Sequence, residues 1–173
     1  MEVKQKYLTE AEAPFTPYTV IEEAARCLLC YDAPCSTGCP AGTDPGKFIR
    51  SIRFRNFKGA AETVRSNNVL GGACARICPY DRTCEEACSR TGIDKPIQIG
   101  KIQRFITDYE KAIGMKVLDA PAATKEKVAV IGAGPAGLAV AASLALKGYA
   151  VTIFEEKSAP GGVMTYGIVP ARL

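Results

Sequence analysis

The sequence predicts two parts: a mainly α-helical N-terminal domain over residues 1–113 and a short α/β unit over residues 127–173, joined by a linker over residues 114–126. Three observations predict this division. Apolar residues of the first part recur at helical spacing around two groups of cysteines. The segment between the parts contains Gly114 and Pro121 among small and charged residues, which is typical of a linker. After it, an apolar run, a glycine-rich turn and a second apolar run follow in β-α-β order.

Composition limits the kind of protein. The 173 residues are 47% hydrophobic, which is enough for a buried core, and the net charge of +4 is too mild to indicate a nucleic-acid or membrane partner. The absence of histidine excludes a Ser-His-Asp or Cys-His centre, a His-ligated zinc and a Rieske cluster. Residues 1–6 are polar and charged, without the apolar region of a secretory signal. We therefore expect a cytoplasmic protein, in which disulfides are disfavoured.

Helix signals place the elements of the first part. Start signals occur at three places: Thr19 with Glu22 three residues later, the pair Asp44–Pro45, and Asn56. Residues 1–18 are expected to form an extended lead-in. The segment from Cys74 to Cys88 is expected to be irregular because Pro79 interrupts it. After Pro96, apolar residues at helical spacing predict a longer amphipathic helix.

The second part has the pattern of a single β-α-β unit. Val128–Ile131 is predicted to be a buried parallel strand, and Ala150–Phe154 a second strand. The intervening helix is expected to end at Lys147–Gly148, because glycine commonly follows the last helical turn. The uncharged stretch 128–146 is long enough to resemble a membrane span, but its glycines and proline divide it into strand, turn and helix. We interpret it as buried and not as membrane-spanning.

The eight cysteines fall into two groups of four. The first group has the spacing C-x2-C-x4-C-x3-C and is followed by Pro40; its members are Cys27, Cys30, Cys35 and Cys39. The second group is Cys74, Cys78, Cys84 and Cys88. Closely spaced thiolates on a loop can hold three corners of an iron–sulfur cubane, and a fourth cysteine before proline often ligates the other cluster. The sequence therefore predicts two [4Fe–4S] clusters in a domain of the α-helical ferredoxin-like kind. Structural zinc, disulfides and free thiols remain as alternatives.

The ligand rule distributes the cysteines between two clusters. Cys27, Cys30 and Cys35 would hold one cluster, completed from the second group, and Cys39 would cross to the other. If every cysteine is used, Cys88 completes the first cluster, and the second is held by Cys39, Cys74, Cys78 and Cys84. Arg26 and Arg76 lie near ligand cysteines and could tune a cluster, although ordinary solvated arginines would look the same. The basic and aromatic run 50–58 is interpreted as the solvated face of a helix, with a protein-docking surface as the alternative.

The turn Gly132–Gly137 has the sequence G-x-G-x-x-G between a predicted strand and a predicted helix. In this context it predicts a Rossmann-type dinucleotide site, in which the glycines allow a tight turn, close approach of a pyrophosphate and close helix–strand packing. Glu155 at the end of the second strand would accept hydrogen bonds from ribose hydroxyls. The candidate residues are Gly132, Gly134, Pro135, Ala136, Gly137, Glu155 and Glu156. Glu156 is included because it is the neighbour of Glu155 and could take the same role. A glycine turn without a ligand is the plain alternative. Only the first β-α-β of such a domain is present, so we expect a truncated unit.

Four segments carry a resemblance to a known family: Cys27–Pro40, Thr43–Ile49, Cys78–Pro79 and Pro96–Gly100. They resemble the N-terminal half of dihydropyrimidine dehydrogenases, and most closely the separate flavin and iron–sulfur subunit of the bacterial NAD-dependent enzyme. The small subunit of glutamate synthase is a related alternative. The resemblance implies two [4Fe–4S] clusters, FAD on the glycine loop, and NAD(P)H bound further along a longer chain. Gly161–Gly162 resembles the FAD-type extension of the loop, and Gly162 and Arg172 are added to the candidate FAD-binding residues.

The resemblance also implies a ligand set that differs from the one in which all eight cysteines are ligands. One cluster would be held by Cys27, Cys30, Cys35 and Cys88, and the other by Cys39, Cys78, Cys84 and Gln103. Cys74 would then be a small buried residue. The implied activity is an electron relay from NAD(P)H through FAD and the two clusters to an FMN-containing catalytic subunit that reduces uracil or thymine. No residue here looks like a catalytic acid, base or nucleophile. A zinc-stabilised interaction module without a redox role is the alternative from a different class.

Overall fold

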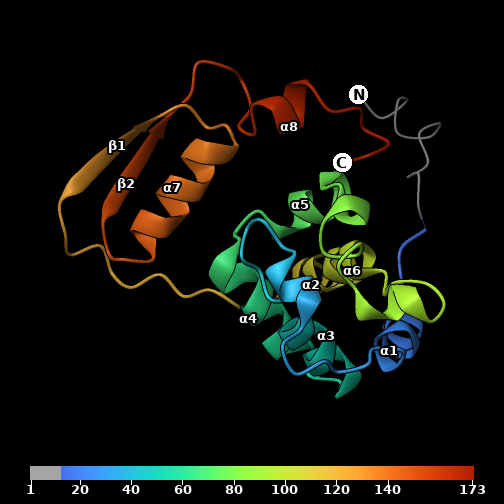
Figure 1. Ribbon diagram of the computed structural model, residues 1–173. Helices are drawn as coiled ribbons and strands as arrows, with labels where there is room; N and C mark the ends of the chain where they lie inside the picture. Colours follow the sequence, from blue (N-terminus) through green and yellow to red (C-terminus); the bar gives the residue numbers. More distant parts are fainter. Residues whose placement is uncertain (1–12) are drawn as a thin grey trace. The chain divides into compact units, whose positions relative to one another are not determined.

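The computed structural model describes residues 13–173 (Figure 1). It divides into two compact units, one formed by Pro14–Val117 and one that includes Leu118–Leu173. The division lies within the segment 114–126. Between residues 13 and 173, no helix combines the length and the apolar character that crossing a membrane requires. Each unit is described separately.

The first unit consists of helices joined by short loops. Its α-helices are α1 (Pro17–Ala25), α2 (Pro34–Thr37), α3 (Pro45–Arg53), α4 (Phe57–Asn67), α5 (Gly71–Ile77) and α6 (Ile99–Ala112). Two 3-10 turns, η2 (Tyr80–Arg82) and η3 (Ser89–Gly92), interrupt the segment between α5 and α6. The long helix expected after Pro96 is therefore confirmed.

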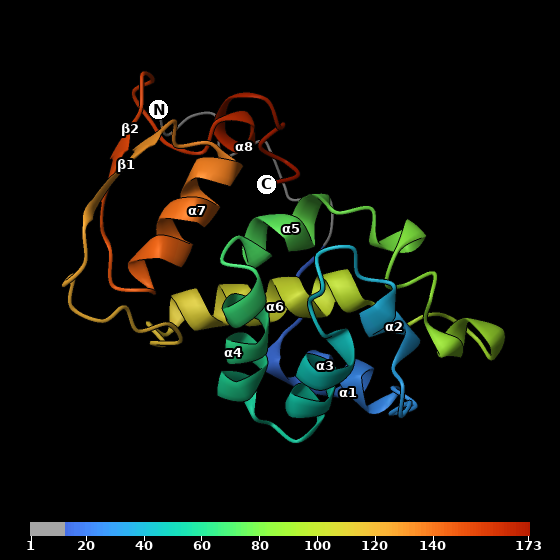
Figure 2. The ribbon, with the colours of Figure 1, turned by 60° about the vertical axis from the view of Figure 1, so that its left-hand side comes forward.

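Helix α6 is the centre of this unit. It contacts α1, α3, α4 and α5, and Figure 2 shows it running past these helices. Apolar side chains on one stripe of α6, among them Ile102 and Ile106, are fully buried against Phe48 and Ile52 of α3. This core fixes the loops that carry the cysteines.

Side-chain caps define where the helices begin. Asp44 Oδ1 accepts the Lys47 N–H at 2.9 Å and Asn56 Oδ1 accepts the Gly59 N–H at 2.9 Å, so both predicted starts are confirmed. The expected start at Thr19 is wrong, because Thr16 caps α1 and Thr19 is its third residue. The two threonines satisfy each other's backbone N–H groups, and Pro17 follows the cap as the first helical residue. Of the expected extended lead-in, residues 1–12 lie outside the described residues.

The segment around Cys74 is more regular than expected. Residues 71–77 form α5, which carries Cys74 and ends one residue before Cys78. Pro79 forces the residue before it out of the helical conformation, and Cys78 accordingly has an extended ψ of 137°. The proline therefore ends a helix here and does not prevent one.

The second unit contains the predicted β-α-β arrangement. Strands β1 (Lys127–Ile131) and β2 (Ala150–Phe154) pair in parallel, with Lys127 opposite Ala150. Helix α7 (Pro135–Ala145) contacts both strands, and α8 (Val163–Tyr166) follows β2 (Figure 1). Gly148 has φ +84°, which explains why a glycine stands before β2.

The expected burial of these strands is wrong. Residues of β1 alternate between exposed and half-buried, and the Ile131 side chain is 82% exposed. The reason is that two strands and one helix leave one face of the sheet without a covering layer, whereas a parallel sheet is normally covered on both faces.

Candidate metal centres and nucleotide-binding loop

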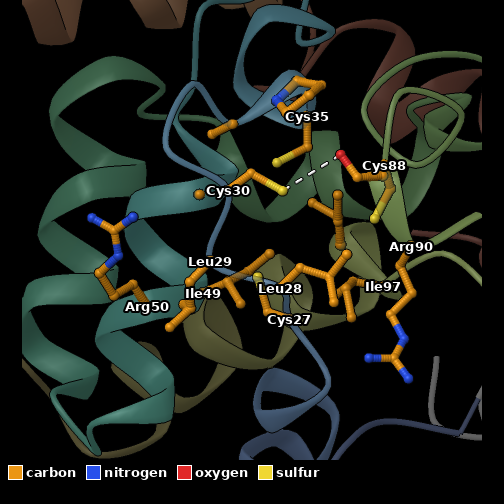
Figure 3. Close-up of a pocket in the computed structure, with 15 residues that line it drawn as sticks. Cys27, Leu28, Leu29, Cys30, Cys35, Ile49, Arg50, Cys88, Arg90 and Ile97 are labelled. Atoms are coloured by element: carbon orange, nitrogen blue, oxygen red, sulfur yellow. Dashed lines mark hydrogen bonds between the residues drawn. The ribbon is translucent and has the colours of Figure 1, made fainter.

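Four cysteines surround one cavity of the helical unit. Cys27, Cys30, Cys35 and Cys88 line about 430 Å³ of empty space, part of which is open to solvent. Their sulfurs point toward a common region (Figure 3). The other lining side chains are mostly apolar and include Leu28, Leu29, Ile49, Ile97 and Ile99. We call this space the first cavity.

Hydrogen bonds from arginines fix the backbone beside Cys27. Arg53 Nη1 donates to the Cys27 carbonyl at 3.0 Å, and Arg90 Nη1 donates to the Arg26 carbonyl. The loop from Cys27 to Cys35 then turns back through two left-handed residues, Leu29 with φ +57° and Ala33 with φ +35°. Such conformations cost about 1–3 kcal/mol each in non-glycine residues, so the surrounding packing must hold this loop in shape.

A second cavity contains five side chains that could ligate a metal. Cys39, Cys74, Cys78, Cys84 and Gln103 line about 380 Å³ of empty space, again partly open to solvent. Gln103 as a residue is 8% exposed, and its Nε2 donates to the Gly71 carbonyl at 2.9 Å. This bond uses the nitrogen end of the amide, whereas a metal ligand would use the oxygen end.

Two chain segments each contribute to both cavities. The segment of α2 supplies Cys35 to the first cavity and Cys39 to the second, and the segment 84–88 supplies Cys84 to the second and Cys88 to the first. They touch at Gly38, where an added Cβ would lie 2.8 Å from the Ala87 Cβ. Ile99, which is 1% exposed, lines both cavities. The two cavities are therefore neighbours that share parts of their walls.

Burial makes three of these thiols poor thiolates by themselves. Burial, with the nearby Cys88 and Cys27, raises the pKa of Cys35 to about 11. Burial and Cys78 raise the pKa of Cys74 to about 11, and burial raises the pKa of Cys84 to about 12. Metal ligation needs deprotonated sulfur, so the positive charge of bound iron would have to offset both burial and the repulsion between neighbouring thiolates.

The donor set fits iron–sulfur clusters. None of the eight cysteines, all of which lie in the described residues, is in a disulfide. Between residues 13 and 173, no three Cys, Asp or Glu side chains are close enough together to hold a single metal ion. Each cavity instead places four sulfurs around an open space, which is the arrangement that a cubane needs.

The two arginines noted near cysteines are engaged with carboxylates. Arg26 donates to Glu23 Oε1 at 2.7 Å and to Asp94 Oδ1 at 3.2 Å. Arg76 donates to both carboxylate oxygens of Asp108, at 2.9 and 2.7 Å. Hydrogen bonds from Arg90, then from the backbone of Lys95 and from Arg26, lower the pKa of Asp94, so this carboxylate stays ionised. The positive charges of these arginines are thus already paired.

The glycine loop of the second unit has the shape of a phosphate site. Gly132 adopts φ +91°, and Gly134 is the N-terminal cap of α7 with no atom within 4 Å of an added Cβ. Gly137 packs so closely that a Cβ would collide with the Gly132 carbonyl oxygen. Pro135 is the first residue of α7, and Ala136 is exposed. The open space at Gly134, beside the N–H groups of the first turn of α7, suits a pyrophosphate.

Glu155 lies directly beside this loop. Its Oε2 accepts the Ala133 N–H at 2.6 Å and its Oε1 accepts the Lys157 N–H at 2.9 Å. These bonds, led by the one from Lys157, lower the pKa of Glu155 and keep it ionised. Gly162, with φ +56°, also approaches the loop, because an added Cβ would lie 2.9 Å from the Gly134 Cα.

The structure does not bring every candidate to the glycine loop. Glu156 is exposed on the loop after β2. Arg172 is exposed near the end of the chain, where its backbone N–H donates to the Val169 carbonyl at 2.9 Å.

Sequence reasoning missed the residues that support the cysteines from other segments. Arg53 belongs to the basic run that was interpreted as solvated, yet it binds the Cys27 backbone. Ser89 hydrogen-bonds Cys30 although 59 positions separate them. The position of Ser89 next to Cys88 was the one signal that could have identified it.

Comparison with known families agrees with this geometry. The family described as dihydropyrimidine dehydrogenase domain II, 4Fe-4S cluster, matches residues 4–115. The NAD(P)-binding Rossmann-like domain family matches residues 130–170. Thus the helical part has the features of an iron–sulfur domain, and the small parallel sheet belongs to a Rossmann-like segment.

Individual relatives show the same similarity. Over 170 residues the chain is 57% identical to the NAD-dependent dihydropyrimidine dehydrogenase subunit PreT of Salmonella typhimurium and 56% identical to that of Escherichia coli K12. The alignments cover 98% of this chain and 41% of each relative, so the chain spans less than half the length of these relatives. The resemblance inferred from the cysteine and glycine motifs is confirmed. The chain belongs to the dihydropyrimidine dehydrogenase domain II family of 4Fe-4S proteins.

Proposed function

We propose that this chain forms the electron-transferring part of an NAD(P)H- and FAD-dependent oxidoreductase of the dihydropyrimidine dehydrogenase type. The observation that carries the proposal is the pair of cavities, each lined by four cysteines and sharing chain segments. Two neighbouring one-electron centres are what a relay requires. The names of the relatives support the same enzyme class.

The proposed ligands follow the two cavities. Cys27, Cys30, Cys35 and Cys88 would hold one [4Fe–4S] cluster in the first cavity. The second cavity would hold the other through Cys39, Cys78, Cys84 and Gln103. The domain of residues 1–113 would be α-helical ferredoxin-like, followed by the linker 114–126 and the first β-α-β of an FAD domain over 127–173.

FAD is the proposed dinucleotide of the glycine loop. Its pyrophosphate would lie at Gly134 against the N–H groups of α7, and the ionised Glu155 would accept hydrogen bonds from ribose hydroxyls. Gly162, which approaches Gly134, would complete the site. When bound, FAD accepts the electron pair of a nicotinamide hydride and releases single electrons, which iron–sulfur clusters carry.

The proposed partner is an FMN-containing catalytic subunit that reduces uracil or thymine in the cytoplasm. Within this chain, cysteines and backbone position the cofactors, and no described side chain is assigned as acid, base or nucleophile. Glutamate synthase is the alternative within the oxidoreductases; the relatives' names favour the pyrimidine enzyme.

Two measurements test the proposal. Anaerobically purified protein is assayed for iron, acid-labile sulfide and zinc, and comparable amounts of iron and sulfide are expected. Stoichiometric zinc without sulfide would instead support the zinc-stabilised module. The full-length gene product is also purified with its natural partner: an FMN subunit with pyrimidine reductase activity supports the proposal, and a glutamine amidotransferase subunit overturns it.

A pair of variants tests the ligands of the second cavity. We expect Cys74→Ala to keep both clusters and Gln103→Ala to perturb one, because the proposed set uses the Gln103 oxygen and leaves Cys74 as a half-buried free thiol. Iron content and the spectrum of the reduced clusters are compared. Cluster loss in Cys74→Ala together with an unchanged Gln103→Ala would show that all eight cysteines are ligands.

A further inference from the structure

One side chain outside the ligand set contacts a cysteine sulfur of the first cavity. Cys30 Sγ lies 3.4 Å from Ser89 Oγ, and the dashed line in Figure 3 marks this hydrogen bond. The two residues come from different segments, because Cys30 lies in the loop after α1 and Ser89 begins η3 directly after Cys88. With a protonated thiol, Cys30 is the donor and the hydroxyl oxygen of Ser89 is the acceptor.

Ligation would reverse the direction of this hydrogen bond. A sulfur bound to iron has lost its proton and can only accept. A serine hydroxyl can rotate to donate, so the Ser89 O–H would point at Cys30 Sγ without movement of the backbone. The reversed bond would have a charged acceptor, and such bonds are stronger than those between neutral groups.

The charged groups around this cavity do not point at its sulfurs (Figure 3). Besides Ser89, the polar lining residues are Arg50 and Arg90, and Figure 3 shows both guanidinium groups pointing away from the sulfurs. Arg90 donates to both carboxylate oxygens of Asp94, at 2.8 and 3.0 Å. The hydroxyl of Ser89 is therefore a polar lining group that the structure places against the sulfur of Cys30.

We propose that Ser89 is a positioning residue for Cys30 whose hydroxyl donates to the ligated sulfur and raises the reduction potential of the cluster in the first cavity. The added electron of a reduced cluster increases negative charge on the sulfurs, so a hydrogen bond to sulfur stabilises the reduced form more than the oxidised form. This inference rests on the proposed iron–sulfur function and concerns one of its two centres.

The test is a redox titration of anaerobically purified protein, followed by electron paramagnetic resonance of the reduced clusters. Ser89→Ala removes the donor, Ser89→Thr restores a hydroxyl, and Thr91→Ala removes a different exposed hydroxyl, one that donates to the Glu85 carbonyl. In Ser89→Ala we expect the reduced-to-oxidised ratio of one cluster at fixed potential to fall by up to about tenfold, which is about 59 mV for one electron. Ser89→Thr and Thr91→Ala should keep the wild-type potential, and iron content should stay the same in all variants.

The outcomes separate this inference from the function on which it rests. Wild-type protein without iron and sulfide would reject the proposed function. Wild-type clusters with an unchanged potential in Ser89→Ala would reject the role of Ser89 alone. Loss of iron from Ser89→Ala would also reject it, because the hydroxyl would then be needed to hold the structure of the site. An equal shift in the potentials of both clusters would reject it as well, because the effect would then not depend on the hydrogen bond to Cys30.

Discussion

Cys88→Ala is expected to lower the bound iron to about half that of the wild type, because one cavity loses a sulfur while the other keeps its proposed ligands. Cys88 is one of four thiols around the first cavity and does not line the second. Iron and acid-labile sulfide are measured after anaerobic purification. The resonance spectrum of the reduced protein identifies which cluster remains.

Two further variants make this result specific. Cys84→Ala should also remove about half of the iron, because Cys84 lines only the second of these cavities. The spectrum that remains should be that of the cluster in the first cavity. Thr91→Ala changes an exposed side chain near Cys88 and should keep all of the iron. Wild-type iron content in Cys88→Ala would contradict the assignment of this cysteine.

Gly134→Ala should weaken FAD binding by about tenfold or more, or about 1.4 kcal/mol, without changing the stability of the free protein. The backbone at Gly134 has φ −72°, which alanine adopts freely, and the added methyl group meets no protein atom within 4 Å. It would instead occupy the space through which the pyrophosphate approaches. Flavin affinity and thermal unfolding are measured on the full-length gene product.

Gly137→Ala is the matched comparison within the same loop. Its methyl group collides with the Gly132 carbonyl, so this variant should lose flavin and also about 1–3 kcal/mol of stability. Flavin affinity in Gly134→Ala equal to that of the wild type would show that the loop does not bind a dinucleotide in the proposed way.

Local signals in the sequence were enough to place most helices. Asp44 and Asn56 cap α3 and α4 as expected, since a cap needs only a short polar side chain and the N–H group three residues later. The cap of α1 was misplaced because Thr16 and Thr19 are both suitable, and Pro17 decides between them. Helix α5 was not predicted because Pro79 was expected to break the whole segment. The seven residues that precede Cys78 can nevertheless form a helix that ends before the proline.

Contacts between distant segments could not be predicted in the same way. Cys30 and Ser89, or Arg53 and the Cys27 carbonyl, meet only after α1, α3 and η3 have packed, and no spacing rule connects them. The burial of β1 was overestimated for a related reason. A run such as Val128–Ile131 shows that a strand can be buried, but the layers on either side of the sheet decide whether it is.

The short stretch of chain between Cys35, which lies in α2, and Cys39, two residues after the end of α2, has a consequence for electron transfer between the two proposed clusters. Four residues of chain span at most roughly 13–14 Å even when fully extended, so covalent geometry limits how far apart these two cysteines can move. The segment from Cys84 to Cys88 also contributes one cysteine to each cavity, and it limits the distance between the cavities in the same way. The distance between the two proposed clusters would thus be limited by short stretches of backbone, and it would change little while other parts of a larger enzyme open, close or exchange partners.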